Sequence, residues 1–160
     1  EGVDLLVMGR PEGPGCYCAA NNIIRKYTDK LSEDYPYVVI DNEAGLEHLS
    51  RRTTHDVDLL LVVSDPTLRG IITARRIIDL VKELGLKAKD SALIINRTVH
   101  EPDDELKGMV SRQGLHISGF VPSDEKILEY DLAGIPLIKL PAEAKSLRAM
   151  YAILDKLKIP

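Results

Sequence analysis

The sequence contains no tryptophan and a single phenylalanine, Phe120. Its two cysteines, Cys16 and Cys18, are too few for a disulfide framework. No apolar run approaches the roughly 20 residues that span a bilayer, and no basic segment precedes an apolar stretch of the kind that directs export. Lys and Arg number 21 against 25 Asp and Glu, so the net charge of −4 offers nucleic acid no basic surface. We therefore expect a cytoplasmic protein with neither membrane nor nucleic acid as a partner.

What remains is the composition of a folded domain. The 160 residues are 44% hydrophobic and 29% charged, which argues against disorder and is enough for one substantial core. Because aromatic residues are scarce, Leu, Ile and Val must build that core, and this choice suits a buried parallel sheet. With no internal repeat or long linker, we expect a single α/β domain over residues 1–160.

Five apolar runs predict the strands of the sheet. They are rich in Val, Leu and Ile and lack polar alternation, so we expect both faces of the sheet to be covered. The runs are Val3–Met8, Tyr37–Asp41, Leu59–Ser64, Ala92–Asn96 and Ile117–Val121. Because the sequence enters the first run almost at once, we expect that the N-terminal part of a longer protein is missing.

Helical patterns separate these runs. The clearest follows Asp65-Pro66, an acceptor side chain before a proline that the first turn tolerates, and stops at Gly85. Its apolar stripe consists of Leu68, Ile71, Ile72, Ile78, Val81 and Leu84. Further helices are predicted at Ala20–Leu31, Asp103–Gln113, Glu125–Leu132 and Ala142–Lys158. The βαβα order predicts right-handed crossovers and a doubly wound, mostly parallel sheet with helices on both faces.

The end of the Tyr37–Asp41 run has the form of a Walker B strand joined to a switch loop. An apolar strand delivers the carboxylate of Asp41, and Gly45 permits a sharp turn soon after it. Such an Asp can hold magnesium through water, and such a glycine can turn its N–H toward a terminal phosphate. The alternative is that Asp41 only caps the following helix, because an Asp after apolar residues is common.

Two segments carry a resemblance to a known family. Residues 41–49, DNEAGLEHL, and residues 9–18, GRPEGPGCYC, resemble the CooC family of accessory ATPases, which mature nickel-containing carbon monoxide dehydrogenase. That family is similar to the MinD and nitrogenase iron-protein group of P-loop ATPases, which work as nucleotide-switched dimers. The resemblance covers residues 1–160 and implies a longer N-terminal half-sheet.

The sequence departs from this family in one respect. None of its eleven glycines is followed by Lys, so it holds no G-x-x-x-x-G-K-[ST] loop to cradle a phosphate. We therefore expect an incomplete, P-loop NTPase-like fold that is the C-terminal part of an ATPase domain. The full-length protein would then be an ATPase using ATP or ADP with magnesium, and this chain alone would be inactive.

Cys16 and Cys18 lie in a glycine- and proline-rich loop. Two thiolates supply half of a tetrahedral site, and a second copy of the chain completes it most simply by contributing its own pair. The resemblance implies that this pair is an inter-subunit site for zinc or nickel in a homodimer. The alternatives are two small buried side chains or a redox-sensitive loop.

Two later strands end in residues suited to a purine. Asn96 offers an amide that donates and accepts in one plane, and Pro122 offers a flat apolar face. The resemblance implies that these strand ends hold adenine, through Asn96, Arg97, Val121 and Pro122. By themselves, Asn-Arg and Pro-Ser-Asp are more typical of turns and helix caps than of a binding site.

No other constellation points to chemistry. His48 and His55 lie seven residues apart and could share a helix face, but without a supporting carboxylate they are typical of surface or packing positions. No serine nucleophile motif with a His and Asp partner is present, which leaves covalent hydrolysis without support.

Three functions are therefore open. The first is an ATP-driven metallochaperone that loads nickel into carbon monoxide dehydrogenase or another nickel enzyme. The second is a non-catalytic regulatory or dimerisation module that has lost nucleotide binding. The third, a cell-division ATPase, would require a basic amphipathic C-terminal helix, and in Ala142–Lys158 the basic residues are offset by Glu143 and Asp155.

Overall fold

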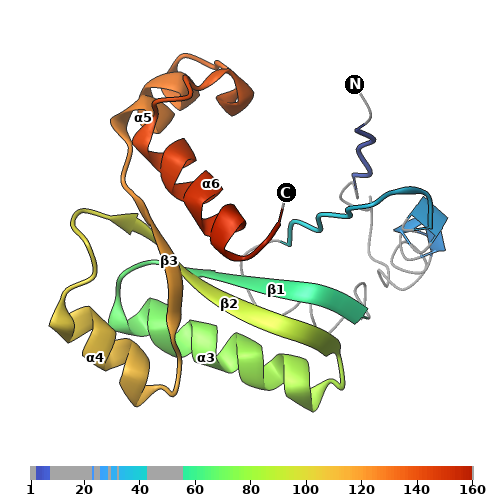
Figure 1. Ribbon diagram of the computed structural model, residues 1–160, viewed down its shortest axis with the longest axis horizontal. Helices are drawn as coiled ribbons and strands as arrows, with labels where there is room; N and C mark the ends of the chain where they lie inside the picture. Colours follow the sequence, from blue (N-terminus) through green and yellow to red (C-terminus); the bar gives the residue numbers. More distant parts are fainter. Residues whose placement is uncertain are drawn as a thin grey trace, which may run out of the picture. The chain divides into compact units, whose positions relative to one another are not determined.

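The computed structural model describes residues 3–7, 23, 26–28, 30, 31, 33–42 and 56–159 (Figure 1). The chain divides into two compact units, Glu1–Val57 with Leu80–Lys87 and Asp58–Asp79 with Ala88–Pro160. In the first unit, the described residues between 23 and 34 are helical, as predicted for Ala20–Leu31. None of the helices in the described parts is long and apolar enough to cross a membrane.

The regular structure is a three-stranded sheet with helices packed on it (Figure 1). The strands, in the spatial order β1-β2-β3, are β1 (Asp56–Ser64), β2 (Lys87–Thr98) and β3 (Ile117–Pro122). The helices are α3 (Leu68–Glu83), α4 (Asp104–Arg112), α5 (Glu125–Leu132) and α6 (Lys145–Lys156), with a short 3-10 helix η1 (Leu137–Lys139) before α6. This architecture confirms the predicted α/β class with a parallel sheet.

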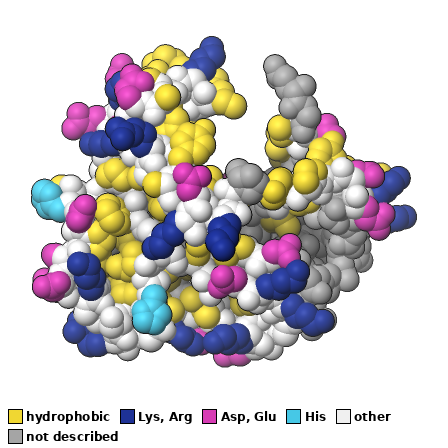
Figure 2. Space-filling model, viewed as in Figure 1, with side chains coloured by type: hydrophobic (Ala, Val, Ile, Leu, Met, Phe, Trp, Pro, Cys, Tyr) yellow, Lys and Arg dark blue, Asp and Glu magenta, His cyan; other side chains and the backbone are white. Residues whose placement is uncertain are grey.

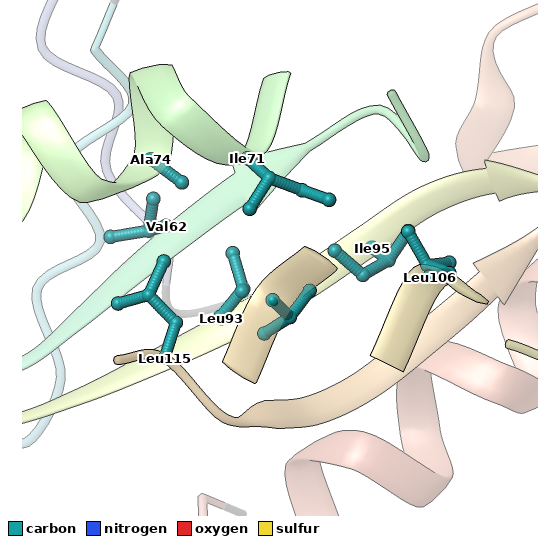
Figure 3. Close-up of a cluster of buried hydrophobic side chains, with 8 residues drawn as sticks. Val62, Ile71, Ala74, Leu93, Ile95, Leu106 and Leu115 are labelled. Atoms are coloured by element: carbon teal, nitrogen blue, oxygen red, sulfur yellow. The ribbon is translucent and has the colours of Figure 1, made fainter. Parts of the chain in front are cut away.

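The main core lies between the sheet and the helices α3 and α4 (Figure 3). Its members are all aliphatic, as the shortage of aromatic residues requires. They are Val62, Ile71, Ala74, Leu93, Ile95, Leu106, Val110 and Leu115. Phe120, the one phenylalanine, packs against the edge of this cluster. The core therefore holds β1, β2, α3 and α4 together through close-packed Leu, Ile and Val side chains.

The second face of the sheet is covered by α6 where β3 lies. Gly119 of β3 allows α6 to approach closely, because a Cβ at that position would lie 2.7 Å from Ile153 Cδ1. The Lys156 ammonium donates to the Ser118 carbonyl at 2.8 Å. Helix α6 therefore packs on the face opposite α3 and α4, and helices cover both faces at this edge.

Coverage of the second face is incomplete at β1. Strand β2 is buried on both faces from Ala92 to Ile95, as expected for a central strand. In β1, however, Val62 is buried while Leu61 is 36% exposed and Val63 is 57% exposed. The side chains of β1 therefore alternate between a buried face and a face that no described helix covers.

Two of the five predicted strands are absent from the described residues. Residues 3–7 of the predicted strand Val3–Met8 and residues 37–42, which include Tyr37–Asp41, have no regular structure. Their apolar side chains are exposed, Val39 by 92%. A strand exists through hydrogen bonds to a neighbour, and no described strand pairs with either segment. Apolar composition alone therefore predicted the wrong structure here.

The helix predictions were correct in position but not at every end. Helix α3 begins after Thr67, whose hydroxyl accepts from the Gly70 N–H at 3.0 Å, so Thr67 and not Asp65 supplies the side-chain cap. Leu68, placed in the apolar stripe, is exposed because it lies at the first residue of the helix. Gly85 ends the helix as predicted, with a φ of +66°. Helix α6 is shorter than Ala142–Lys158 at both ends.

The close approach at Gly119 generates a stability prediction. Gly119→Ala should destabilise the protein by about 1–3 kcal/mol, because the added methyl group meets the buried Ile153 side chain. The double variant with Ile153→Ala should lose less than the sum of the two single variants, because the smaller side chain makes room. Urea unfolding measures all three.

Gly108→Ala is the matched control. Its Cβ would meet nothing closer than Arg112 Nη1 at 3.6 Å, and it lies inside α4. This change should stabilise the protein by about 0.5–1 kcal/mol through helix propensity. Equal effects of the two alanines would show that α6 does not pack against β3 as closely as the structure has it.

Candidate nucleotide-binding site

The carboxyl ends of β2 and β3 lie side by side and bring four predicted residues together. The two strands pair in parallel, with Asn96 opposite Val121 and Thr98 opposite Pro122. Arg97 lies between the two paired positions of β2. Because strands of a parallel sheet deliver their carboxyl ends to one edge, this edge is where such folds bind ligands. The resemblance placed Asn96, Arg97, Val121 and Pro122 in one site, and the structure shows these residues as neighbours.

The backbone at Arg97 adopts an unusual conformation. Its φ of 57° lies in the left-handed region, and the register between β2 and β3 shifts between Asn96 and Thr98. The irregular register interrupts the ladder at this point and, like a β-bulge, changes the direction of the side chains at the end of the strand. The Asn96 Oδ1 atom accepts a hydrogen bond from the Arg97 N–H at 2.9 Å. A non-glycine residue in this conformation costs about 1–3 kcal/mol and is enriched at functional sites.

Thr98 joins the two strand ends and was not singled out by the sequence. It is 3% exposed, its hydroxyl donates to the Val121 carbonyl at 3.4 Å, and its carbonyl accepts from the Ser123 N–H at 2.8 Å. These bonds hold the segment after β3 against the end of β2. No local sequence signal marks Thr98, because both of its partners lie in another strand or the loop that follows it.

Asp124 connects the same segment to two helices. Its carboxylate accepts from the Lys126 N–H of α5 at 3.1 Å, and from the Ser146 N–H and hydroxyl of α6 at 2.9 and 2.8 Å. The bonds from Ser146 and from the Lys126 N–H, together with the charge of Lys145, lower the pKa of Asp124, although burial opposes them. The carboxylate is therefore charged at neutral pH, and the bonds weaken only as the pH falls below the usual range of Asp.

The other predicted site residues belong to the first compact unit, and most of them are not described. Asp41 is exposed and follows a segment without regular structure, so it does not stand at the end of a strand. Gly45, Cys16 and Cys18, together with His48 and His55, lie outside the described residues. Within the part that is described, no group of three or more His, Cys, Asp or Glu side chains is arranged to hold a metal ion.

Comparison with known proteins relates the chain as a whole to ATP-binding proteins. No protein-family model matches the sequence. The chain is 47% identical over 154 residues to an ATP-binding protein of Methanocaldococcus jannaschii with no characterised function, covering 96% of this chain and 61% of that protein. It is 32% identical over 157 residues to the carbon monoxide dehydrogenase accessory protein CooC of Rhodospirillum rubrum, covering 96% of this chain and 59% of CooC. The chain thus spans less than two thirds of the length of both relatives.

The fold is also similar to those of solved ATPase structures. The septum site-determining protein MinD of Pyrococcus horikoshii, solved in complex with Mg-ADP, superposes with a TM-score of 0.66 at 20% identity, covering 86% of this chain and 56% of that chain. A ParA family ATPase of Chlorobium tepidum superposes with a TM-score of 0.59. The homologues of this chain are therefore ATP-binding proteins of the MinD/ParA P-loop family, and its fold is the α/β fold of that group.

The conformation of Arg97 can be tested by substitution. Arg97→Gly should be more stable than Arg97→Ala by about 1 kcal/mol, because only glycine adopts a positive φ without a steric cost. Lys158 has the same φ of 57° and lies beyond the end of α6, away from the ends of β2 and β3. Lys158→Gly and Lys158→Ala therefore serve as the control pair. Thermal unfolding compares the four proteins, and equal stability of the Gly and Ala variants at position 97 would exclude strain there.

Proposed function

We propose that the protein acts in an ATP-dependent metallochaperone that assists nickel insertion into carbon monoxide dehydrogenase or another nickel enzyme, as a nucleotide-switched dimer. The observation that carries the nucleotide part is the register that sets Asn96 beside Val121 and Thr98 beside Pro122, in a chain whose homologues bind ATP. The metallochaperone part is supported by the 32% identity to CooC along 96% of the chain.

The residues at the strand ends fit an adenine base. Because Asn96 Oδ1 is engaged by the Arg97 N–H, the side chain presents its Nδ2 group, and no described residue accepts a hydrogen bond from that group. In this conformation Asn96 is a donor suited to a purine ring nitrogen. Pro122 and Val121 would supply the apolar surface against which the base packs. The edge thus selects a flat heterocycle with an acceptor on its rim.

The phosphates require groups beyond this edge. Bound magnesium supplies positive charge that offsets the charge of the phosphates. Asp41 would hold that ion, and the Gly45 N–H would detect the terminal phosphate. A phosphate-binding loop with its lysine is not encoded in these 160 residues, so a longer form of the protein would have to provide it.

Nickel is the cargo in this scheme. Cys16 and Cys18 from two copies would form a four-thiolate site, which zinc also fits. Opening and closing of the dimer with the ATP and ADP states would load and release the metal. A non-catalytic dimerisation module is the second candidate, favoured by one observation, the lack of any glycine followed by lysine.

Nucleotide binding by these 160 residues should be weak. Without a phosphate loop, we expect a dissociation constant for MgATP on the order of 1 mM, equivalent to about −4 kcal/mol. Backbone NMR titration should show the shifts at Asn96, Arg97 and Val121. Asn96→Asp keeps the oxygen that accepts from Arg97 but loses the donor, so it should abolish the shifts. Micromolar affinity, or shifts elsewhere, would contradict the assignment.

The metal site is tested by removing both thiols. Cys16→Ser with Cys18→Ser should lose the bound zinc or nickel and shift the dimer toward monomer, because serine does not replace a thiolate ligand. Elemental analysis and mass in solution measure the two effects. Metal binding by the native pair should also weaken as the pH falls, since the thiols must lose protons. A double variant that stays a metal-loaded dimer would contradict the four-thiolate site and make His48 and His55 the next candidate ligands.

A further inference from the structure

We propose that Asp124 is a positioning residue for the nucleotide: by capping α5 and α6 at once, it holds the Val121–Pro122 end of β3 in place. The inference rests on the proposed function, because the adenine nucleotide named there is its ligand. Asp124 itself stands two residues beyond the strand and acts through the backbone it fixes.

One carboxylate serves two helix N-termini. Oδ1 accepts from Lys126 in the first turn of α5, and Oδ2 accepts from the N–H and hydroxyl of Ser146, which lies 22 residues further along the chain. The cap residue of α6, Ala144, makes no side-chain hydrogen bond of its own. Ser146 is 5% exposed, so without this acceptor its N–H and hydroxyl would be buried donors without a hydrogen bond, which would destabilise the folded protein. Asp124 therefore provides α6 with the side-chain cap that its own residues lack.

Helix α5 depends on this cap more than the other helices do. None of its residues is buried, and Leu128 and Leu132 are exposed. Hydrophobic side chains lie open over the α5 and η1 region at the top of the view in Figure 2. By contrast, α4 buries Leu106 and Val110 in the core. Because no residue of α5 is fully buried, the hydrogen bond from the Lys126 N–H to Asp124 is an important contact at its junction with β3.

The contacts of α6 show which part of β3 lies near the hydrogen bonds between Asp124 and Ser146. The helix runs antiparallel to the strand, with Lys156 at Ser118 and Ile153 at Gly119 near the start of β3. The Asp124–Ser146 contact lies at the opposite end, beside the predicted adenine residues. Thr98 holds that end from the side of β2. The Val121–Pro122 segment is thus fixed from two sides, and loss of Asp124 removes one of them.

The test uses the full-length protein and compares the wild type with three variants, Asp124→Ala, Asp124→Asn and Asp103→Ala. Asp124→Ala should raise the dissociation constant for MgATP about five- to tenfold, because the base loses a preformed surface. Asp124→Asn keeps an oxygen for the cap of α5 but puts a donor where Ser146 also donates, so it should recover only part of the affinity. Calorimetry gives the affinities, and amide hydrogen exchange at Ser123 reports loosening of the segment.

Asp103→Ala is the matched control for the loss of a helix cap. Asp103 accepts from the Leu106 N–H at 2.8 Å at the start of α4, and its side chain makes no hydrogen bond with the described ends of β2 and β3. Asp103→Ala should also lower the melting temperature, by less than Asp124→Ala because it removes one hydrogen bond and not three, while leaving MgATP affinity and Ser123 exchange unchanged. A selective loss of affinity at position 124 supports the positioning role.

The possible outcomes distinguish a failure of the positioning role of Asp124 from a failure of the proposed nucleotide-binding function. If the wild-type protein does not bind MgATP, the proposed function is wrong and the role of Asp124 falls with it. If the wild type binds and Asp124→Ala binds equally well, or if Asp103→Ala loses affinity to the same extent, the function stands and the positioning role is overturned. Should Asp124→Ala fail to fold, Asp124→Asn carries the same comparison.

Discussion

The parallel pairing of β2 with β3 is the contact on which both the core and the candidate site depend. On one face it brings Leu93 and Ile95 against α3 and α4, and on the other it presents Gly119 to α6. At the carboxyl ends the same ladder sets Asn96 beside Val121. Because side chains alternate along a strand, one register decides which residues are buried and which face a ligand.

Hydrogen bonds fix the geometry of the strand ends beyond the apolar core. Arg97 adopts a costly φ, and the bonds made by Asn96 and Thr98 compensate in part for it. Beyond the end of β3, α5 buries no residue, and Asp124 caps it by accepting from the Lys126 N–H. A rigid core thus supports a strand end whose fine geometry depends on a few polar contacts, which is the arrangement that preorganised binding requires.

Most of the fold beyond residue 56 was predictable because its signals are local. Helix α5 was predicted with its observed bounds, and Gly85 ends α3 as its freedom at positive φ suggests. The start of α6 was not predictable, because Ala144 carries no cap and the acceptor comes from Asp124. The segments 3–7 and 37–42 were predicted as strands from apolar composition, but a strand also needs a hydrogen-bonding neighbour, which composition does not reveal.

By itself, the sequence determined the α/β class and the aliphatic core, since both depend on residue type and spacing, but it placed the ends of β2 and β3 at Asn96 and Val121 where the strands continue to Thr98 and Pro122. The resemblance to CooC, carried by residues 9–18 and 41–49, agrees with the 32% identity found over most of the chain. Only the tertiary structure decided that Asn96 and Val121 are paired, that Thr98 closes the edge and that Asp124 reaches Ser146. The reason is physical: these contacts join residues 22 or more positions apart, and their register is set by packing of the whole sheet.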